Sequence, residues 1–255
     1  MLNKKIGSQL YGLRDACKTE KDLNETLKKL KDIGYKAVQV SGIGVTDGRV
    51  IKELLDAYDM EIICTHQNYN AFSNSIKTVI NFNKDLGSQI AGLGSGFYDD
   101  SLSPKDAAKK FISDINSFKN AVESEGLTFA YHNHAFEFAK IDGKYLMDYI
   151  LEDTDVKFVL DTYWLAIAGQ DPAEFISKHK DRIAVLHYKD LKMPLKSNAP
   201  TMCEVGYGNL NFDKIIQASN ALDGVFAVVE QDTTDKDIFE SAKLSYDYLT
   251  TKGFI

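Results

Sequence analysis

The chain has 255 residues, of which 44% are hydrophobic, enough to bury the core of one large domain or two small ones. A formal net charge of −7 disfavours a protein that grips nucleic-acid phosphates, because that work needs a basic face. No apolar stretch approaches the roughly 18 residues of a membrane span, and the N-terminus lacks the apolar run of a signal peptide. We therefore expect a soluble, cytoplasmic protein that binds neither membranes nor nucleic acids.

Short runs rich in β-branched and aromatic residues recur along the chain and alternate with longer segments of helical period. The eight predicted strands cover residues 5–11, 37–42, 61–66, 89–94, 128–134, 157–162, 183–190 and 226–232. The eight predicted helices cover residues 20–34, 47–59, 75–87, 104–126, 144–153, 171–180, 211–222 and 235–253.

Two of these helices carry clear end signals. The first has an apolar stripe (Leu23, Leu27, Leu30 and Ile33) followed by Gly34 at the stop position. The fourth begins with Ser103 as the predicted N-cap and Pro104 in the first turn.

The alternation of strands and helices predicts the fold. Eight strand-then-helix units in about 250 residues match a (β/α)8 TIM barrel, and right-handed parallel crossovers favour its closure. An open doubly wound sheet is the alternative, but the glycines after the fourth predicted strand lack the spacing of the dinucleotide fingerprint. No linker or repeat divides the chain, so we predict an α/β fold with one TIM-barrel domain over residues 1–255.

The cysteines indicate no covalent framework. Cys17, Cys64 and Cys203 are widely spaced and form no C-x-x-C pair, so neither a disulfide scaffold nor a thiolate zinc site is expected.

Almost every predicted strand ends in a residue that can coordinate, titrate or bond a hydroxyl. These residues are Gln9 and Arg14, Gln39, His66, His132 with His134, Asp161, His187 with Lys189, and Glu230. In a TIM barrel the carboxyl ends of the strands converge on one mouth, which holds the active site.

Asp161 and Glu230 each end an apolar run, where burial is costly without a positive partner, and a divalent cation would supply that partner. His187 also ends an apolar run, and the segment 129–138 offers a further histidine. Two carboxylates and two imidazoles form a mixed shell suited to manganese, zinc, cobalt or iron. The alternatives are a helix N-cap or an ion pair for each carboxylate and a core position for the histidine.

In an extended chain His132 and His134 face one side and Asn133 the other. We favour His132 as the metal ligand because it holds the strand-end position, with His134 further out towards substrate. Glu137 is either an acceptor for a substrate hydroxyl or an outer-shell partner of a histidine, with a loop salt bridge as the alternative.

Other residues are predicted substrate contacts. His66 is a candidate contact or proton relay, with a structural histidine as the alternative. Trp164 could wall off a sugar ring or pack between helix and barrel, and Gln9 and Arg14 stand near the mouth. The segment 205–212 is predicted to form a glycine-hinged loop over the mouth, or only a tight turn, before a helix capped by Asn211 or Asp213.

The motifs YHNHAFEF, LDTYW, LHYKD and VGYGNLNF, in this order, resemble the sugar isomerase, epimerase and dehydratase superfamily with the xylose-isomerase-like barrel. The resemblance runs from GSQLYGLRD to VVEQD. It implies a divalent metal, most commonly Mn²⁺ with Zn²⁺, Co²⁺, Fe²⁺ or Mg²⁺ as alternatives, held by residues of the last four strands. Asp161, His187 and Glu230 match three of these ligands, and the interval of 26 residues between the first two (187 − 161) is similar to that of the family.

The first ligand departs from the epimerase pattern. Where tagatose 3-epimerase-like members carry Leu-Glu-Pro, this chain has Tyr131, His132 and Asn133. This histidine version of the motif is more similar to inosose dehydratases and to relatives that act on 3-keto-glucosides. The metal set implied by the resemblance is therefore His132 with the three ligands named above.

The resemblance implies an isomerase or epimerase that enolises a keto sugar. Glu230 is the expected base, His132 or His134 would return a proton, and Lys189 would neutralise an oxyanion or hold a hydroxyl. A lyase or hydratase acting on a keto-inositol or a 3-keto-glucoside is the alternative. An inactive sugar-binding barrel stays open, as does assembly into a homo-oligomer, whereas the acidic charge argues against a DNA-repair endonuclease of the same fold.

Overall fold

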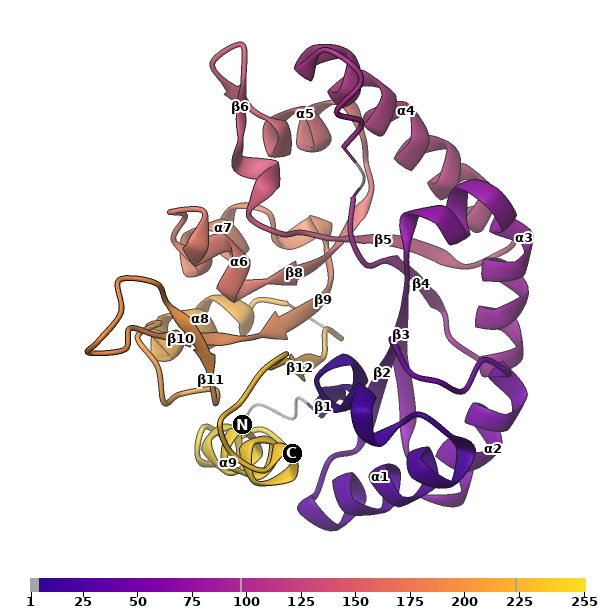
Figure 1. The fold of residues 1–255 in the computed structure, drawn as a ribbon, viewed down its shortest axis with the longest axis vertical. Coiled ribbons are helices and arrows are strands. Elements are labelled where there is room, and N and C mark those ends of the chain that lie inside the picture. Colours follow the sequence, from indigo (N-terminus) through magenta and orange to yellow (C-terminus); the bar gives the residue numbers. More distant parts are fainter. Residues whose placement is uncertain (1–4, 97, 223) are drawn as a thin grey trace.

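The computed structural model describes residues 5–96, 98–222 and 224–255, and eight parallel strands close into a barrel within them. Figure 1 shows these strands at the centre of a ring of helices. In chain order they are β1 (Ile6–Gln9), β2 (Ala37–Ser41), β3 (Glu61–Gln67), β4 (Ile90–Leu93), β5 (Thr128–His132), β8 (Lys157–Asp161), β9 (Ile183–Tyr188) and β12 (Ala227–Val229). The barrel prediction and the place of all eight strands are confirmed.

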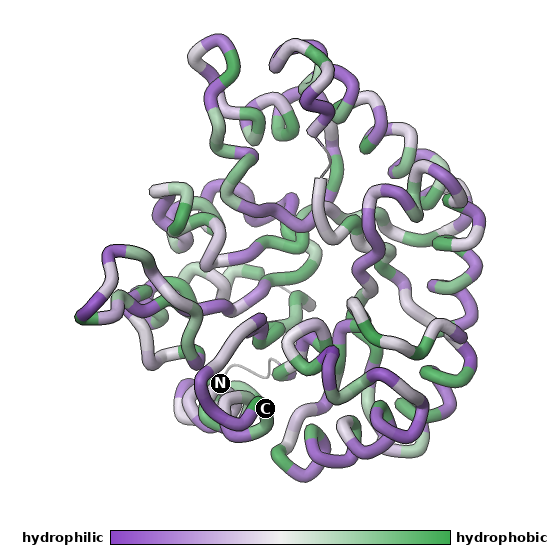
Figure 2. The backbone as a smooth tube through the Cα atoms, viewed as in Figure 1, coloured by the Kyte–Doolittle hydropathy of each residue, from purple (hydrophilic) through white to green (hydrophobic). Residues whose placement is uncertain are grey.

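The eight predicted helices are also present. They are α1 (Glu20–Ile33), α2 (Gly48–Ala57), α3 (Tyr69–Leu86), α4 (Pro104–Glu123), α5 (Leu146–Asp153), α7 (Pro172–Lys178), α8 (Phe212–Ser219) and α9 (Ile238–Thr251). In Figure 2 these outer helices carry both hydrophobic and hydrophilic residues, as expected of elements with one face on the barrel. Among the described helices, none combines the length and the apolar character needed to cross a bilayer.

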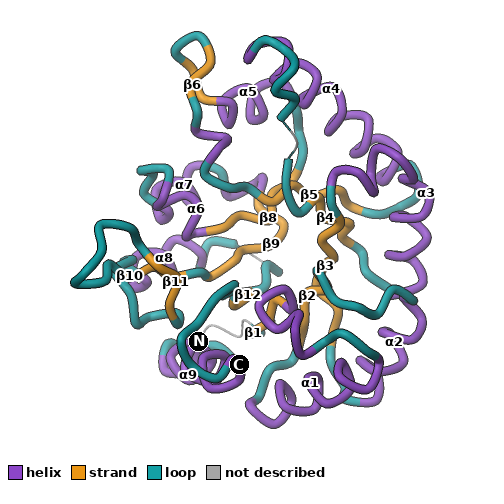
Figure 3. The backbone as a smooth tube through the Cα atoms, viewed as in Figure 1, coloured by secondary structure: helices purple, strands orange, loops and turns teal. Residues whose placement is uncertain are grey.

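Several short elements were not predicted. They are α6 (Thr162–Ile167), the 3-10 helices η1 (Leu10–Ala16), η2 (Phe136–Phe138) and η3 (Lys180–Arg182), and the strands β6 (Lys140–Ile141), β7 (Lys144–Tyr145), β10 (Asp190–Lys192) and β11 (Thr201–Cys203). Figure 3 shows that the β6–β7 and β10–β11 hairpins lie outside the barrel. Such segments of two to seven residues are too short to establish a hydrophobic period.

The predicted end signals act as expected. Leu23, Leu27 and Leu30 of α1 are fully buried, and Gly34 ends the helix with a φ of 125°, which a side chain would strain. The Ser103 hydroxyl accepts a hydrogen bond from the Asp106 N–H at 3.2 Å, so Ser103 caps α4 as predicted.

Helix α3 differs from its prediction in a way that matters below. It begins at Tyr69 rather than Ser75, because the Asn68 side chain caps the earlier turn by accepting from the Ala71 N–H at 2.9 Å. Ser75 then has non-helical angles (φ −156°, ψ 57°), which kink the helix. The predicted start of the helix therefore falls on its kink.

The barrel interior is filled rather than hollow. One cluster of small and branched side chains from the strands packs inside it: Ala37, Ile63, Cys64, Ala130, Val159, Val185 and Val228. A larger apolar cluster joins the outer face of the barrel to the helices. All three cysteines are buried and free. The packed interior gives the strand ends a rigid floor.

Candidate functional site

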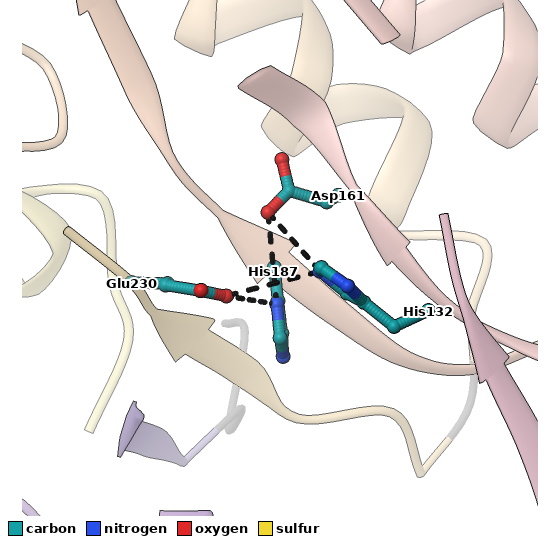
Figure 4. A group of neighbouring side chains, drawn as sticks. All are labelled: His132, Asp161, His187 and Glu230. Carbon is teal, nitrogen blue, oxygen red and sulfur yellow. Dashed lines mark ion pairs between the residues drawn. The ribbon is translucent and has the colours of Figure 1, made fainter. Parts of the chain in front are cut away.

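Four side chains converge at the carboxyl ends of four neighbouring barrel strands (Figure 4). His132 ends β5, Asp161 ends β8, His187 lies in β9, and Glu230 directly follows β12. Asp161 and His187 are register partners, and the Glu230 N–H donates to the Tyr188 carbonyl at 3.2 Å. Barrel register thus brings together residues that lie up to 98 positions apart (230 − 132).

One atom from each of these side chains faces a common point. Nε2 of His132 lies 3.5 Å from Oδ2 of Asp161 and 4.0 Å from Oε2 of Glu230. Nδ1 of His187 lies 3.7 Å from the same Asp161 oxygen and forms a short ion pair with Glu230. All four atoms lie within 4.8 Å of one another and are buried, and among the described residues none of them has a hydrogen-bond partner outside the cluster.

This arrangement fits a divalent cation. Nitrogen and oxygen ligands at about 2.0–2.2 Å from an ion in tetrahedral geometry lie roughly 3.4 Å from one another. The separations above are close to that value, and unpaired buried polar atoms are otherwise costly.

The other ring nitrogen of each histidine is fixed by a partner. Nδ1 of His132 lies 3.0 Å from the Gly94 carbonyl oxygen, and Nε2 of His187 lies 2.7 Å from Oε1 of Gln39. Because each partner atom is an acceptor, the ring proton sits on that nitrogen and the lone pair of the other nitrogen faces the cluster. Metal-ligating histidines in proteins are held in this way.

The second oxygen of each carboxylate is also occupied. Oδ1 of Asp161 accepts from the Trp164 N–H at 3.0 Å and thereby caps α6. Oε1 of Glu230 accepts from Nζ of Lys189 at 3.2 Å. Each carboxylate therefore offers one free oxygen to the common point.

The charges call for a cation. With neutral imidazoles, Asp161, Glu230 and Asp232 contribute −3 and Lys189 contributes +1, which leaves −2 (−3 + 1) in a buried site. Burial opposes a charge on His187, but Glu230 and Asp161 outweigh it and raise the His187 pKa to about 9. A proton is therefore drawn to the place that a dication would fill.

A cavity of about 520 Å³ opens beside the cluster, a volume suited to a small ligand. Among the predicted site residues, its lining includes Gln9, His66, His132, His134, Trp164, Lys189 and Glu230. Polar residues that the sequence did not single out, among them Tyr11, Asn68 and Asp232, also line it.

Two histidines outside the cluster line this cavity, and each has a ring nitrogen without a hydrogen-bond partner among the described residues. Nε2 of His66 and Nδ1 of His134 are buried without a partner. Burial and the neighbouring His132 lower the pKa of both rings, to about 3 for His134. Both are neutral near pH 7 and can accept a hydrogen bond from a ligand.

Lys189 stays charged although it is buried. Burial lowers its pKa, but Glu230, Asp161 and Asp232 outweigh burial and raise the pKa above the ordinary value. Nζ lies 2.8 Å from Oδ2 of Asp232 and 5.3 Å from the ring of Trp164. Trp164 lines the cavity, and its Nε1 is buried without a partner.

Glu137 lies away from the cavity lining, so the interpretation as a substrate contact is not retained. Its carboxylate is fully buried and accepts from the His134 N–H at 2.8 Å and from the Tyr131 hydroxyl. The short helix η2 carries the side chain inward, so Glu137 fixes the backbone that holds His134.

Arg14 is likewise not among the described residues that line the cavity. Its guanidinium donates to the Tyr11 carbonyl at 2.7 Å and to the Asp232 carbonyl at 3.4 Å, and it stacks on the Tyr11 ring. Arg14 therefore supports the wall of the cavity from behind.

The segment 205–212 does not line the cavity either. The Asp190 carboxylate accepts from the N–H groups of Gly206 and Gly208, each at 3.0 Å, and holds this segment as a turn. The tight-turn alternative is the one observed, and Asn211 caps α8.

Sequence reasoning missed three supporting residues. Gln39 stood at a predicted strand end without a role, Asn133 accepts from the Asp161 N–H at 2.9 Å, and Asp232 holds Lys189. Asp232 had a detectable signal, because it lies two positions after Glu230 in an extended run.

Comparisons with known proteins place the chain in a family. The family model described as a xylose isomerase-like TIM barrel matches residues 27–248. The inosose dehydratase of Clostridium beijerinckii is 20% identical over 274 residues, covering 92% of this chain and 91% of that protein. The inosose dehydratase of Geobacillus thermodenitrificans is 26% identical over 157 residues, which cover 54% of this chain and only about half, 52%, of that relative.

The fold is also similar to solved structures. A sugar phosphate isomerase/epimerase from Parabacteroides distasonis aligns with a TM-score of 0.76 at 22% identity, covering 98% of this chain and 94% of that one. The family resemblance is thereby confirmed, and the chain belongs to the xylose isomerase-like TIM barrels, within the superfamily of sugar isomerases, epimerases and dehydratases.

Proposed function

We propose that the protein is a divalent-metal-dependent enzyme that removes a proton next to the ketone of a keto sugar or a keto-inositol. The observation that supports this most strongly is the set of four buried, unpaired ligand atoms beside a cavity of small-molecule size. Within the part of the chain that the structure describes, no residue outside the cluster bonds to these atoms, and each side chain is oriented by a partner on its far side.

His132, Asp161, His187 and Glu230 would hold the cation, and their mixed nitrogen and oxygen atoms suit Mn²⁺. When bound, a divalent cation supplies Lewis-acid stabilisation of the negative charge that develops on a ketone oxygen as the adjacent proton leaves.

Glu230 is the proposed base. Of the two carboxylates in the cluster, it is the one that lines the cavity, whereas Asp161 is fully buried. Burial raises the pKa of Glu230, but Lys189, His187 and His132 together outweigh burial and hold the pKa well below its ordinary value, so the side chain is ionised and has the lone pair that a base needs.

Lys189 and His134 are proposed to handle the substrate hydroxyls. Lys189 keeps its charge beside Glu230 and Asp232 and can hold a hydroxyl or an oxyanion at the cavity wall. The unpaired Nδ1 of His134 can exchange a proton with a substrate hydroxyl, whereas His132 is committed to the cation.

We favour dehydration as the outcome. Glu230 takes the proton, a carbon–carbon double bond forms, and the hydroxyl on the next carbon leaves as water after gaining a proton from His134 or Lys189. Two observations support this: the matched relatives named above are inosose dehydratases, and an imidazole stands at the first ligand position where epimerases have a carboxylate.

Epimerisation or isomerisation is the second candidate. It requires a second group that returns a proton to the carbon skeleton after Glu230 has acted. His66 and His134 both line the cavity, each has a ring nitrogen without a hydrogen-bond partner, and either could do this.

The test is to follow the metal-loaded protein by NMR in deuterated water with a panel of keto sugars, keto-inositols and 3-keto-glucosides. Loss of water with a new alkene signal identifies a lyase, and deuterium in a ketone of altered configuration identifies an epimerase. If no member of the panel exchanges or reacts, the proposed function is wrong.

A further inference from the structure

We propose that the substrate carries an apolar substituent, aromatic or branched alkyl, which binds in a groove between β2, β3 and α3 beside the catalytic cavity. The inference rests on the proposed function, which concerns the part of the substrate that reacts. It adds an apolar part that binds but does not react.

The groove adjoins the catalytic cavity. It has a volume of about 390 Å³ and lies where α3 faces the ends of β2 and β3. Five residues line both spaces: Ser41, Gly42, His66, Gln67 and Asn68. A ligand held beside the four-residue cluster therefore has the groove as its neighbouring space on the side of His66.

The chemistry of the groove differs from that of the cavity. Beyond the shared residues its walls are mostly apolar, formed by Val40, Ile43, Val45, Ala71, Val79 and Phe82. Among the described residues that line it there is no aspartate, glutamate, lysine or arginine, whereas the cavity contains Lys189, Glu230 and Asp232. Against these apolar side chains a sugar ring would find few partners for its hydroxyls, with Thr46 adding one hydroxyl, whereas an apolar group needs no partner.

Two features of helix α3 affect the polarity and the shape of the groove wall. The hydroxyls of Ser75 and Thr78 bond to each other at 2.6 Å, so neither needs a ligand as partner. Ser75 is also the kink of α3, which bends the helix at the groove wall.

A glycine lies where the two spaces adjoin. Gly42 has a φ of 65°, and a Cβ there would meet the Tyr11 ring at 2.6 Å. The absent side chain therefore allows the backbone at Gly42 to pack against the Tyr11 ring.

The volume is adequate for the proposed substituent. An apolar cavity of about 150 Å³ can already hold a benzene ring, and the groove is more than twice that size. Burying a phenyl group instead of a methyl group removes enough extra apolar surface from water to tighten binding by at least about tenfold.

The experiment compares phenyl and methyl β-D-3-keto-glucosides on the metal-loaded protein. Calorimetry gives both dissociation constants, and NMR in deuterated water gives proton exchange. We expect the phenyl glycoside to bind at least about tenfold more tightly than the methyl glycoside. The Ala71→Phe substitution, which fills the groove, should remove this difference and leave the affinity for the methyl glycoside unchanged.

The control is Ala218→Phe. Ala218 is a partly buried helical alanine that lines a separate cavity between α7 and α8, so its substitution should preserve the phenyl preference. Val45→Asn, which places an amide in the groove from a loop, should weaken phenyl binding without demanding that a helix accept a larger side chain.

The outcomes separate the two proposals. Equal affinities for both glycosides, or a phenyl preference that survives Ala71→Phe and Val45→Asn, would overturn the groove assignment even if exchange is observed. Groove-dependent phenyl binding without any exchange would support the groove assignment and count against the proposed reaction.

Discussion

The two halves of the barrel mouth present different chemistry. The second half, formed by β5, β8, β9 and β12, contributes two imidazoles and two carboxylates to one buried cluster. The first half, formed by β1 to β4, contributes neutral groups: Gln9, Gln39, His66, Gln67 and the walls of the apolar groove. One half therefore gathers charge for the reaction, and the other half shapes the space around the substrate.

Removing a ligand from the second half should have the largest effect. Asp161→Ala deletes a cluster carboxylate, so we expect loss of bound metal and a fall in deuterium exchange of on the order of 10³-fold or more. Metal content by mass spectrometry and exchange by NMR measure both. Because Asp161 also caps α6, Asp161→Asn is the control that keeps an acceptor oxygen for the Trp164 N–H while it removes the charge. Full metal content and full exchange in Asp161→Ala would overturn the ligand assignment.

The stability of the protein should depend on pH through Glu137, which lies beneath His134 in the second half of the mouth. Burial raises the pKa of Glu137 from an ordinary 4.5 to about 7. The folded state then binds the proton more tightly than the unfolded state, so the stabilisation is fully present below about pH 4.5 and is lost as pH rises through about 7. Glu137→Gln, which stays neutral, should therefore gain on the order of 3 kcal/mol relative to the original protein between these two pH values.

Urea unfolding of both proteins at several pH values measures this difference, and the metal cluster is common to both. If the difference in free energy of unfolding between the two proteins stayed constant from pH 4.5 to 8, Glu137 would be ionised throughout that range.

The first half also contacts the cluster, through the Gly94 carbonyl after β4 and through the Gln39 side chain, and the second contact offers a way to test the comparison. Oε1 of Gln39, on β2, holds Nε2 of His187 across the barrel at 2.7 Å. We expect Gln39→Leu to weaken metal affinity by about 10- to 100-fold, since the imidazole loses the partner that fixes its proton.

Gln9→Leu is the matched control for Gln39→Leu. Gln9 lines the cavity but contacts the Tyr11 N–H rather than a ligand, so this substitution should weaken substrate binding and leave metal affinity unchanged. If both variants lost metal equally, the division between the two halves would fail.

These contacts also mark what the sequence could reveal. Asp161, His187 and Glu230 were predictable because each polar residue closes an apolar run, and the barrel brings such ends together. The role of Gln39 was not predictable, because its partner His187 lies 148 positions away and no local sequence pattern links the two residues.

Local rearrangements explain the remaining differences. The sequence left Glu137 open as a substrate contact, a partner of a histidine or a loop salt bridge, and the turn of η2 buries it beneath His134. The wall of the apolar groove includes the first turns of α3 and its kink at Ser75. The helical period of the sequence predicted only the part of α3 that follows the kink.

The smallest expected effect concerns Arg14, which stands behind the first half of the mouth. Its guanidinium bonds two carbonyl groups and stacks on Tyr11, so it stiffens the wall but does not face the cavity. Arg14→Ala should therefore change KM by less than about threefold and leave metal content intact, because a surface-linked contact of this kind contributes about 1 kcal/mol or less. Steady-state kinetics on the substrate identified by NMR measures the change. A tenfold rise in KM would instead return Arg14 to the substrate contacts and give the first half of the mouth a charged role.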